Sequence, residues 1–129
     1  MASIFSKIIK GDIPCYKIAE NEHCFAFLDI NPNAKGHTLC IPKIEVDKLS
    51  DLDEETYIEL MLFSRKVAKA IESVIPCNRV GLSVVGLEVP HAHVHLIPLN
   101  AMIDATFTSK VEVTPEEMKI LQDKIVGAL

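Results

Sequence analysis

The amino-acid sequence predicts an α+β fold with a five-stranded antiparallel sheet and helices packed on it. Three observations favour this class: several short segments of strand-like composition, one long segment with helical periodicity between them, and no repeated strand–helix alternation of the kind that builds parallel sheets. The chain has 129 residues, the size of one domain. We therefore expect residues 1–129 to form a single domain.

The first third of the chain predicts a short helix followed by three strands. Apolar residues at positions 4, 5, 8 and 9 have helical spacing, and Gly11 can end that helix. A turn at residues 20–22 predicts a hairpin, and Asp29–Gly36 is dense in turn formers and predicts a loop. Pro42 is expected to stop the third strand. The expected strands are Cys15–Ala19, His23–Leu28 and His37–Ile41.

The segment Ser50–Val74 has the strongest helical pattern. Ser50–Asp53 and the acids that follow predict a capped start, and Pro76 predicts the end. Met61 and Leu62 add apolar surface beyond one stripe, so we expect this helix to meet its mate in a two-fold homodimer. The main apolar stripe consists of Leu60, Phe63, Val67, Ile71 and Val74.

Two further strands and a last helix complete the expected domain. The strands are predicted at Arg79–Val85, which we also place at the dimer contact, and at Val89–Ile97, which Pro90 and Pro98 bracket. Thr114–Glu117 is a capping box with proline at the first helical position, so a helix should begin there. Residues 100–113 show little periodicity, and no element is predicted for them.

Composition excludes several classes of function. Hydrophobic residues make up 49% and charged residues 24%, as in soluble globular proteins. The net charge of -5 disfavours a nucleic-acid partner. The longest apolar run, Cys24–Leu28, is far shorter than the roughly 20 residues of a membrane span, and the first residues lack the apolar core of a signal peptide. We expect a cytoplasmic protein without a membrane partner, with reduced thiols at Cys15, Cys24, Cys40 and Cys77.

Three of the five histidines, His91, His93 and His95, alternate with apolar residues. Alternate side chains of a strand share a face, so these imidazoles are expected about 7 Å apart on one side. A set of merely solvated or core histidines is disfavoured by their number. A zinc site is a second interpretation, although three such positions diverge too much to converge easily on one tetrahedral ion. Nucleophilic or general-acid catalysis is favoured, because adjacent imidazoles oppose each other's protonation and leave a free base.

The motif His91–Ile97 resembles the signature of the histidine-triad (HIT) family. The segments Ile4–Pro14, Ala26–Pro32 and Lys35–Lys43 resemble further parts of that family, in the same order. The resemblance is closest to the Hint branch of purine nucleoside phosphoramidases. It implies a HIT-like homodimer that acts at the α-phosphate of a purine nucleotide, with an AMP or GMP moiety, through a covalent nucleotidyl-histidine. It implies no cofactor.

The resemblance also implies roles for the histidines. His93 matches the nucleophile, and His91 matches the histidine whose main chain orients the nucleophile. His95 matches a histidine that contacts phosphate, and His37 matches a fourth histidine near the site. The alternative for His37 is an ordinary residue at the surface start of a strand.

A nucleotide pocket is implied by the same resemblance. Asp29 matches the carboxylate that binds the ribose hydroxyls, although a turn role alone would also explain an aspartate there. The apolar clamp around the base matches residues that ordinary core packing would also explain: Ile4, Phe5, Ile8, Phe27 and Ile30.

Two departures from the family pattern bear on activity. Gly86–Val89 stands where the Hint branch has Gly-Gln-Ser-Val, which places Leu87, Glu88 and Val89 beside the nucleotide. Leu87 cannot donate to phosphate and Glu88 would repel it. The phosphate-binding asparagine of the Hint branch has no match between Arg79 and Gly86, and Ser83 is the nearest candidate. A dinucleoside polyphosphate hydrolase, or a nucleotide-binding module with little turnover, is therefore kept as an alternative.

The second departure concerns metal. Some bacterial members of the family carry Cys-x-x-Cys in the opening helix, where it binds zinc, and this chain has Ser3 and Ser6 at those positions. Hydroxyls are poor zinc ligands compared with thiolates, so we expect no metal site.

Overall fold

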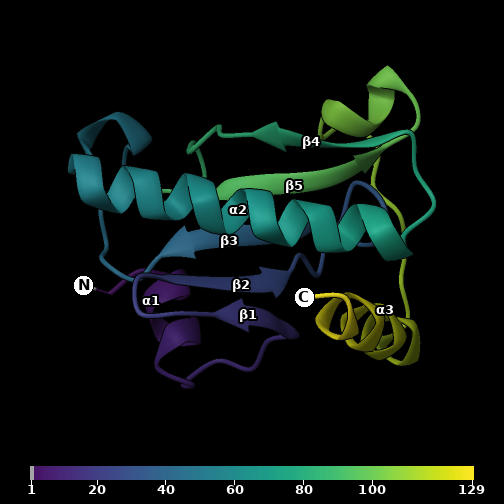
Figure 1. The fold of residues 1–129 in the computed structure, drawn as a ribbon, viewed down its shortest axis with the longest axis horizontal. Coiled ribbons are helices and arrows are strands. Elements are labelled where there is room, and N and C mark those ends of the chain that lie inside the picture. Colours follow the sequence, from purple (N-terminus) through teal and green to yellow (C-terminus); the bar gives the residue numbers. More distant parts are fainter. Residues whose placement is uncertain (1) are drawn as a thin grey trace.

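The computed structural model describes residues 2–129 and shows one antiparallel sheet with helices on both faces (Figure 1). The strand order is β1-β2-β3-β5-β4, so β1 and β4 are the edges. The α+β class and the five strands are confirmed. The strands are β1 (Lys17–Glu20), β2 (Cys24–Leu28), β3 (Thr38–Pro42), β4 (Arg79–Ser83) and β5 (Val94–Leu99). The helices are α1 (Ile4–Ile9), α2 (Glu54–Val74) and α3 (Pro115–Gly127), with short 3₁₀ turns η1 (Leu49–Asp51) and η2 (Met102–Ala105).

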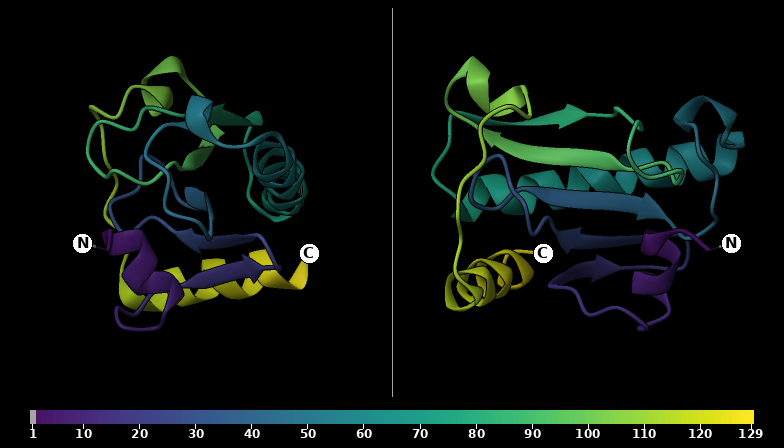
Figure 2. Two further views of the ribbon diagram at one scale, coloured as in Figure 1. Left: turned by 90° about the vertical axis from the view of Figure 1, so that its left-hand side faces the viewer. Right: turned by 180° about the vertical axis from the view of Figure 1, so that it is seen from behind.

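Two apolar clusters hold the layers together. On one face, α2 and α3 cover the sheet, with Leu60 and Ile71 of α2 fully buried. On the other face, α1 packs through Phe5 against Phe25 and Phe27 of β2 (Figure 2). Every residue of β2 is buried because helices cover both of its sides. Within residues 2–129, no helix is both long and apolar enough to cross a membrane.

Each α-helix begins at a side-chain cap. Ser3 accepts from the Ser6 amide, Asp53 accepts from the Thr56 amide, and Thr114 accepts from the Glu117 amide. The expected helix start at Ser50 is wrong by four residues. Ser50 lies in η1, and Asp53 satisfies the first free amides of α2.

The strand that carries the triad is shorter at its start than expected, because β5 begins at Val94 rather than Val89. The chain before it turns away from the sheet. The His91 amide donates to the Val89 carbonyl, and the Ala92 amide donates to the carbonyl of Val46 instead of to β3. His91 and His93 therefore lie outside the strand, and the prediction of three histidines on one strand face is wrong.

Two prolines expected to end or flank strands lie inside them. Pro42 is the last residue of β3, and Pro98 lies within β5. The ladder between these strands extends only from Cys40 paired with Val94 to Thr38 paired with Leu96. Both prolines lie past its ends, where a missing amide breaks no bond of that ladder.

Candidate active site

His91 is held between α1 and the end of β3. Its Nε2 lies 2.8 Å from the Pro42 carbonyl oxygen, and its Nδ1 lies 2.8 Å from Ser3 Oγ. A carbonyl only accepts, so Nε2 carries the proton and Nδ1 accepts from the Ser3 hydroxyl. Both nitrogens are occupied in a fully buried ring. His91 is thus a structural residue and not a free nucleophile.

His93 has the opposite arrangement. Its Nδ1 lies 2.7 Å from the His91 carbonyl oxygen, so Nδ1 is the protonated nitrogen. Nε2 then carries a lone pair. The Phe5 ring packs edge-to-face with the His93 ring at 5.0 Å between centroids, which helps to hold the imidazole in its orientation. The family resemblance implied that the main chain of His91 orients the nucleophile, and the hydrogen bond between the His91 carbonyl and His93 has the geometry for that role.

His93 also lines an open cavity of about 700 Å³. The opposite walls come from the N-terminal part of α2, which supplies Tyr57, and from residues 84–86 that follow β4. The residues expected around the base and ribose, such as Phe5, Phe27 and Asp29, do not line this cavity, so it is not the expected nucleotide pocket.

His37 and His95 form an oriented pair beside His93. The Asn33 amide donates to His37 Nδ1 at 3.0 Å, so the His37 proton is on Nε2. That nitrogen lies 3.0 Å from His95 Nδ1 and donates to it, which leaves the His95 proton on Nε2. The His95 and His93 rings are 4.9 Å apart. His95 can therefore present an N–H donor close to the lone pair of His93.

Burial keeps both of these histidines neutral near pH 7. It lowers the pKa of His37 to about 3, with the neighbouring His95 and the Lys110 ammonium acting in the same direction. It lowers the pKa of His95 to about 4, again with help from nearby positive charge. His37 is only 1% exposed, so the alternative of a surface strand-start residue is wrong.

Asp29 follows β2 and reaches the same place. Its amide donates to the His37 carbonyl, and its Oδ1 accepts from the Asn31 amide at 2.8 Å. Its Oδ2 lies 3.6 Å from His37 Nε2, too far for a hydrogen bond, and remains available to a ligand. Burial raises the pKa of Asp29, while the Asn31 bond and the charge of Lys110 lower it.

The apolar residues predicted around the base fall into two groups. Phe5 and Phe27 are buried, with ring centroids 5.6 Å apart, and Ile8 packs against their cluster. Ile4 and Ile30 are 48% and 80% exposed, so their side chains offer free apolar surface.

The segment before the triad is open to solvent. Leu87 is 87% exposed and Glu88 is also exposed, whereas Val89 packs against the Phe5 cluster. The charge of Glu88 raises the pKa of Asp29, which places its carboxylate within electrostatic reach of the site. Ser83 pairs with His95 across β4 and β5.

The potential metal ligands that converge at this site are poorly arranged to bind a metal ion. Asp29, His37 and His95 each bring one donor atom within 4.8 Å of the others. For His37 Nε2 to bind a cation, its proton would have to move to Nδ1, which faces the donating Asn33 amide. Two donors would then oppose each other, so the hydrogen bonds of this site work against metal binding.

Sequence reasoning missed three residues of this site: Asn33, Phe107 and Lys110. Asn33 was only one turn former among several, yet it is 3% exposed and orients His37. Phe107 lies 4.8 Å from the His95 ring, and Lys110 binds Asn33. The sequence offered only one sign of them, which was an aromatic residue and a lysine within residues 100–113, a segment without periodicity.

The family of the chain follows from comparison with known proteins. The model of the HIT domain matches residues 10–102. The chain belongs to the HIT family. It is 38% identical over 130 residues to an adenosine 5'-monophosphoramidase of Schizosaccharomyces pombe, covering 97% of this chain and 96% of that protein. It is 42% identical over 101 residues to the adenosine 5'-monophosphoramidase of Saccharomyces cerevisiae, covering 75% of this chain and 62% of the yeast protein.

Solved structures of HIT proteins have the same fold. A HIT-like protein of Bartonella henselae superposes with a TM-score of 0.86 at 31% identity, covering 98% of this chain and 96% of that one. A zinc-bound histidine triad protein of Mycobacterium smegmatis has a TM-score of 0.82 at 25% identity, covering 99% of this chain and 93% of that one. The predicted HIT-like fold is confirmed.

Proposed function

We propose that this HIT protein hydrolyses nucleoside 5'-phosphoramidates at the α-phosphate through a covalent bond to His93. The observation that carries the proposal is the pair of tautomers: His93 has a free Nε2, and His95 beside it has a free Nε2–H. The names of the two yeast relatives, both adenosine 5'-monophosphoramidases, support the substrate class.

The reaction has two displacements at phosphorus. His93 Nε2 forms a bond to the α-phosphorus and the P–N bond breaks, so the amine leaves with a proton taken from solvent. The His91 carbonyl holds the Nδ1 proton of the resulting imidazolium. Water then attacks the same phosphorus and gives up a proton to solvent as the P–Nε2 bond breaks, which releases the nucleoside monophosphate and restores His93. His95 donates a hydrogen bond to a phosphate oxygen, whose negative charge grows in both steps.

The other predicted residues complete a nucleotide site. Asp29 is assigned to the ribose hydroxyls and Ser83 to the phosphate side. Glu88 and Val89 border the phosphate, where the charge of Glu88 opposes anion binding. The residues assigned to the purine base, from the AMP or GMP part of the substrate, are Ile4, Phe5, Ile8, Phe27 and Ile30.

Release of AMP from a small substrate panel tests the proposal. Adenosine 5'-phosphoramidate should be hydrolysed faster than diadenosine polyphosphates at equal concentration. The reverse order would identify a dinucleoside polyphosphate hydrolase. Tight AMP binding without turnover of any substrate would support a binding module, the alternative that Leu87 and Glu88 keep open.

We predict a two-fold homodimer through β4 and the adjoining flank of α2. Leu82 on edge strand β4 is 48% exposed, and Tyr57 of α2 and Val85 after β4 add exposed apolar area. Leu62 also belonged to the expected contact, but it lies beside Leu129 on the other flank of α2. Light scattering at micromolar concentration should give twice the chain mass of 14.3 kDa.

Variants at two equally exposed leucines, Leu82 and Leu62, test whether the dimer forms through the proposed contact. Leu82→Glu should give a monomer, because it places charge in the expected contact. Leu62→Glu, at a site that is also 48% exposed, should remain dimeric. A monomeric wild-type protein, or dissociation by Leu62→Glu alone, would contradict the proposed contact.

We also predict that the protein binds no structural zinc. Ser3 Oγ accepts from the Ser6 amide and donates to His91, and the Glu45 carboxylate accepts from the Ser3 amide and the Ser6 hydroxyl. These bonds already satisfy the groups in the place where thiolates bind zinc in other members. Elemental analysis should find well below one zinc per chain, and a chelator should not change the melting temperature. The double variant Ser3→Cys with Ser6→Cys is the positive control, and one tightly held zinc in the wild type would refute the prediction.

A further inference from the structure

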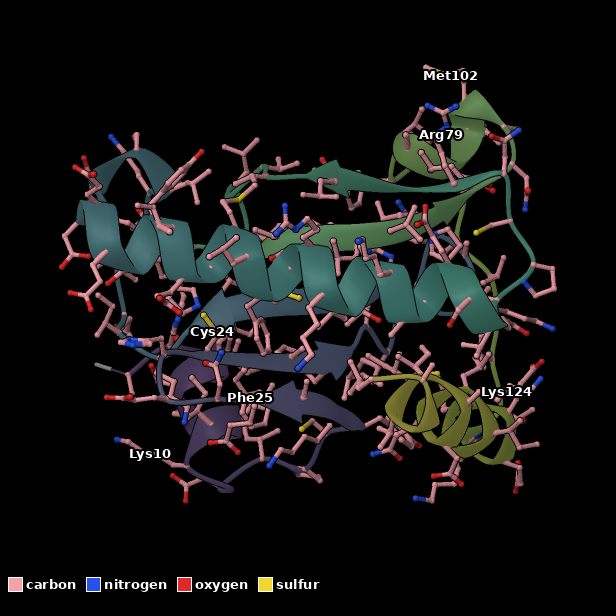
Figure 3. All side chains as sticks on the ribbon, in the orientation of Figure 1. Lys10, Cys24, Phe25, Arg79, Met102 and Lys124 are labelled. Carbon is pink, nitrogen blue, oxygen red and sulfur yellow. The ribbon has the colours of Figure 1, made fainter. Side chains whose placement is uncertain are left out.

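The chain that follows β5 returns to the active site. After η2 it runs towards α3 and passes beside the loop between β2 and β3 (Figure 2). Figure 3 shows where this course begins, with Met102 of η2 at the same end of the sheet as Arg79 of β4. The HIT domain match ends at residue 102, so this connection lies outside it.

Three hydrogen bonds fasten the connection to the β2–β3 loop. Asn33 Nδ2 donates to the Asp104 carbonyl at 3.0 Å, Lys110 Nζ donates to Asn33 Oδ1 at 2.7 Å, and the Val111 amide donates to the Pro32 carbonyl at 3.0 Å. Two of these bonds use the buried side-chain amide of Asn33, and the main-chain amide of the same residue orients His37. One residue therefore ties the connection to the catalytic histidines.

Phe107 has a backbone conformation that is unusual for a residue with a side chain. Its φ is +62°, in the left-handed region that a phenylalanine rarely occupies. Such a conformation persists only where the surrounding structure determines it, and here the ring packs on His95 at 4.8 Å and on His37 at 6.1 Å. The ring forms a wall of the site beside His95 and His37.

Lys110 places a positive charge on that wall. Its Nζ lies 5.1 Å from the centre of the Phe107 ring, in addition to its bond to Asn33. Its charge lowers the pKa of Asp29, His37 and His95, and no other lysine or arginine of residues 2–129 is among the charges that shift these three groups. In a chain of net charge -5, with Glu88 nearby, this ammonium offers a positive charge to an anion at the site.

We propose that Lys110, seated on Phe107 and Asn33, is a binding site for an anionic group on the leaving part of the substrate. The inference rests on the proposed function and names its substrate class. In-line displacement places the leaving group on the side of phosphorus away from His93 Nε2, and Lys110 lies over Phe107, which packs on His95 and His37, whereas Phe5 packs on His93. A carboxylate or phosphate attached to the leaving group can pair with the ammonium there, whereas a neutral amine gains nothing.

A matched pair of substrates tests the site. Adenosine 5'-phosphoramidates of glycine and of glycinamide differ only in a carboxylate against a neutral amide. The wild type should prefer the glycine compound by about three- to tenfold in kcat/KM, and added salt should narrow the ratio. Lys110→Gln should bring the ratio near one, and Lys110→Glu should invert it. Diadenosine triphosphate, whose leaving group carries phosphate, distinguishes a phosphate from a carboxylate as the bound anion. Only a substrate whose anionic group reaches Lys110 should be hydrolysed more slowly by Lys110→Gln.

Two further variants separate binding from general damage. Asn33→Ser keeps the lysine and the main-chain bond to His37 but removes the amide that seats Lys110, so the preference should fall. Lys119→Gln, on the exposed face of α3, should keep the wild-type ratio.

Each remaining outcome has one meaning. An unchanged ratio in Lys110→Gln overturns the inference, and so does an equal loss for both substrates, which would assign the charge to the α-phosphate. If the wild type hydrolyses neither compound, the proposed function is wrong and the inference falls with it.

Discussion

Replacement of His93 by alanine should lower turnover of every substrate by at least about a thousandfold, as expected for loss of a nucleophile. The ring is held at Nδ1 by the His91 carbonyl, and its Nε2 is the nitrogen left free for phosphorus. His91 cannot replace it, because both of its nitrogens are bonded. His95 cannot replace it either, because its Nδ1 accepts from His37 and its Nε2 carries the proton. Steady-state AMP release measures the effect.

The same variant should still fold and bind AMP. A melting curve and a binding titration separate loss of chemistry from loss of structure. His23→Ala is the matched control, since that histidine belongs to the turn before β2 and not to the site. Wild-type protein quenched during turnover should carry an acid-labile nucleotide adduct, and His93→Ala should carry none. Near-normal turnover by His93→Ala would rule out the covalent mechanism.

Replacement of Asp29 by alanine should weaken ribonucleotide binding by about 1.5–3 kcal/mol. Its Oδ1 is occupied by the Asn31 amide, but Oδ2 lacks a hydrogen bond and stands at the edge of the site. A carboxylate suits the vicinal 2'- and 3'-hydroxyls, because it accepts from both and the bonds are charge-assisted. Titration with AMP measures the loss.

The deoxy sugar is the control for that measurement. Binding of 2'-deoxy-AMP should suffer less from Asp29→Ala, because one of the two bonds is already missing. The turn at Asn31 depends on the same side chain, so a melting curve of the variant checks that the loop remains folded. Equal losses for the two nucleotides would remove Asp29 from the ribose site.

Local patterns predicted most of the elements correctly. The spacing of the first isoleucines predicted α1 over Ile4–Ile9, and the Thr114–Pro115 start predicted α3. Both features depend on residues within one or two helical turns, and a sequence displays such neighbours directly. The errors arose at boundaries. Whether Val89–His93 continued β5 depended on the carbonyl of Val46, which pairs with Ala92 from a distant part of the chain.

The same distinction holds for the active site. The alternating histidines and the order of the family motifs determined the candidate nucleophile, because a motif within seven residues is readable without folding. The tertiary structure decided the state of each ring. Ser3 and Pro42 occupy the two nitrogens of His91, the His91 carbonyl accepts from His93 Nδ1–H and so fixes its tautomer, and the Asn33 main-chain amide orients His37.

The sequence by itself determined the family, the fold class and the choice of His93 as the candidate nucleophile. Only the tertiary structure brought Phe107 and Lys110 to that histidine's neighbours, across more than seventy residues from Asn33. The physical reason is that Asn33 makes long-range contacts, which leave no periodic pattern in the nearby sequence. Its buried side-chain amide must satisfy its hydrogen bonds, and the partners that satisfy them, Asp104 and Lys110, are far away in the sequence.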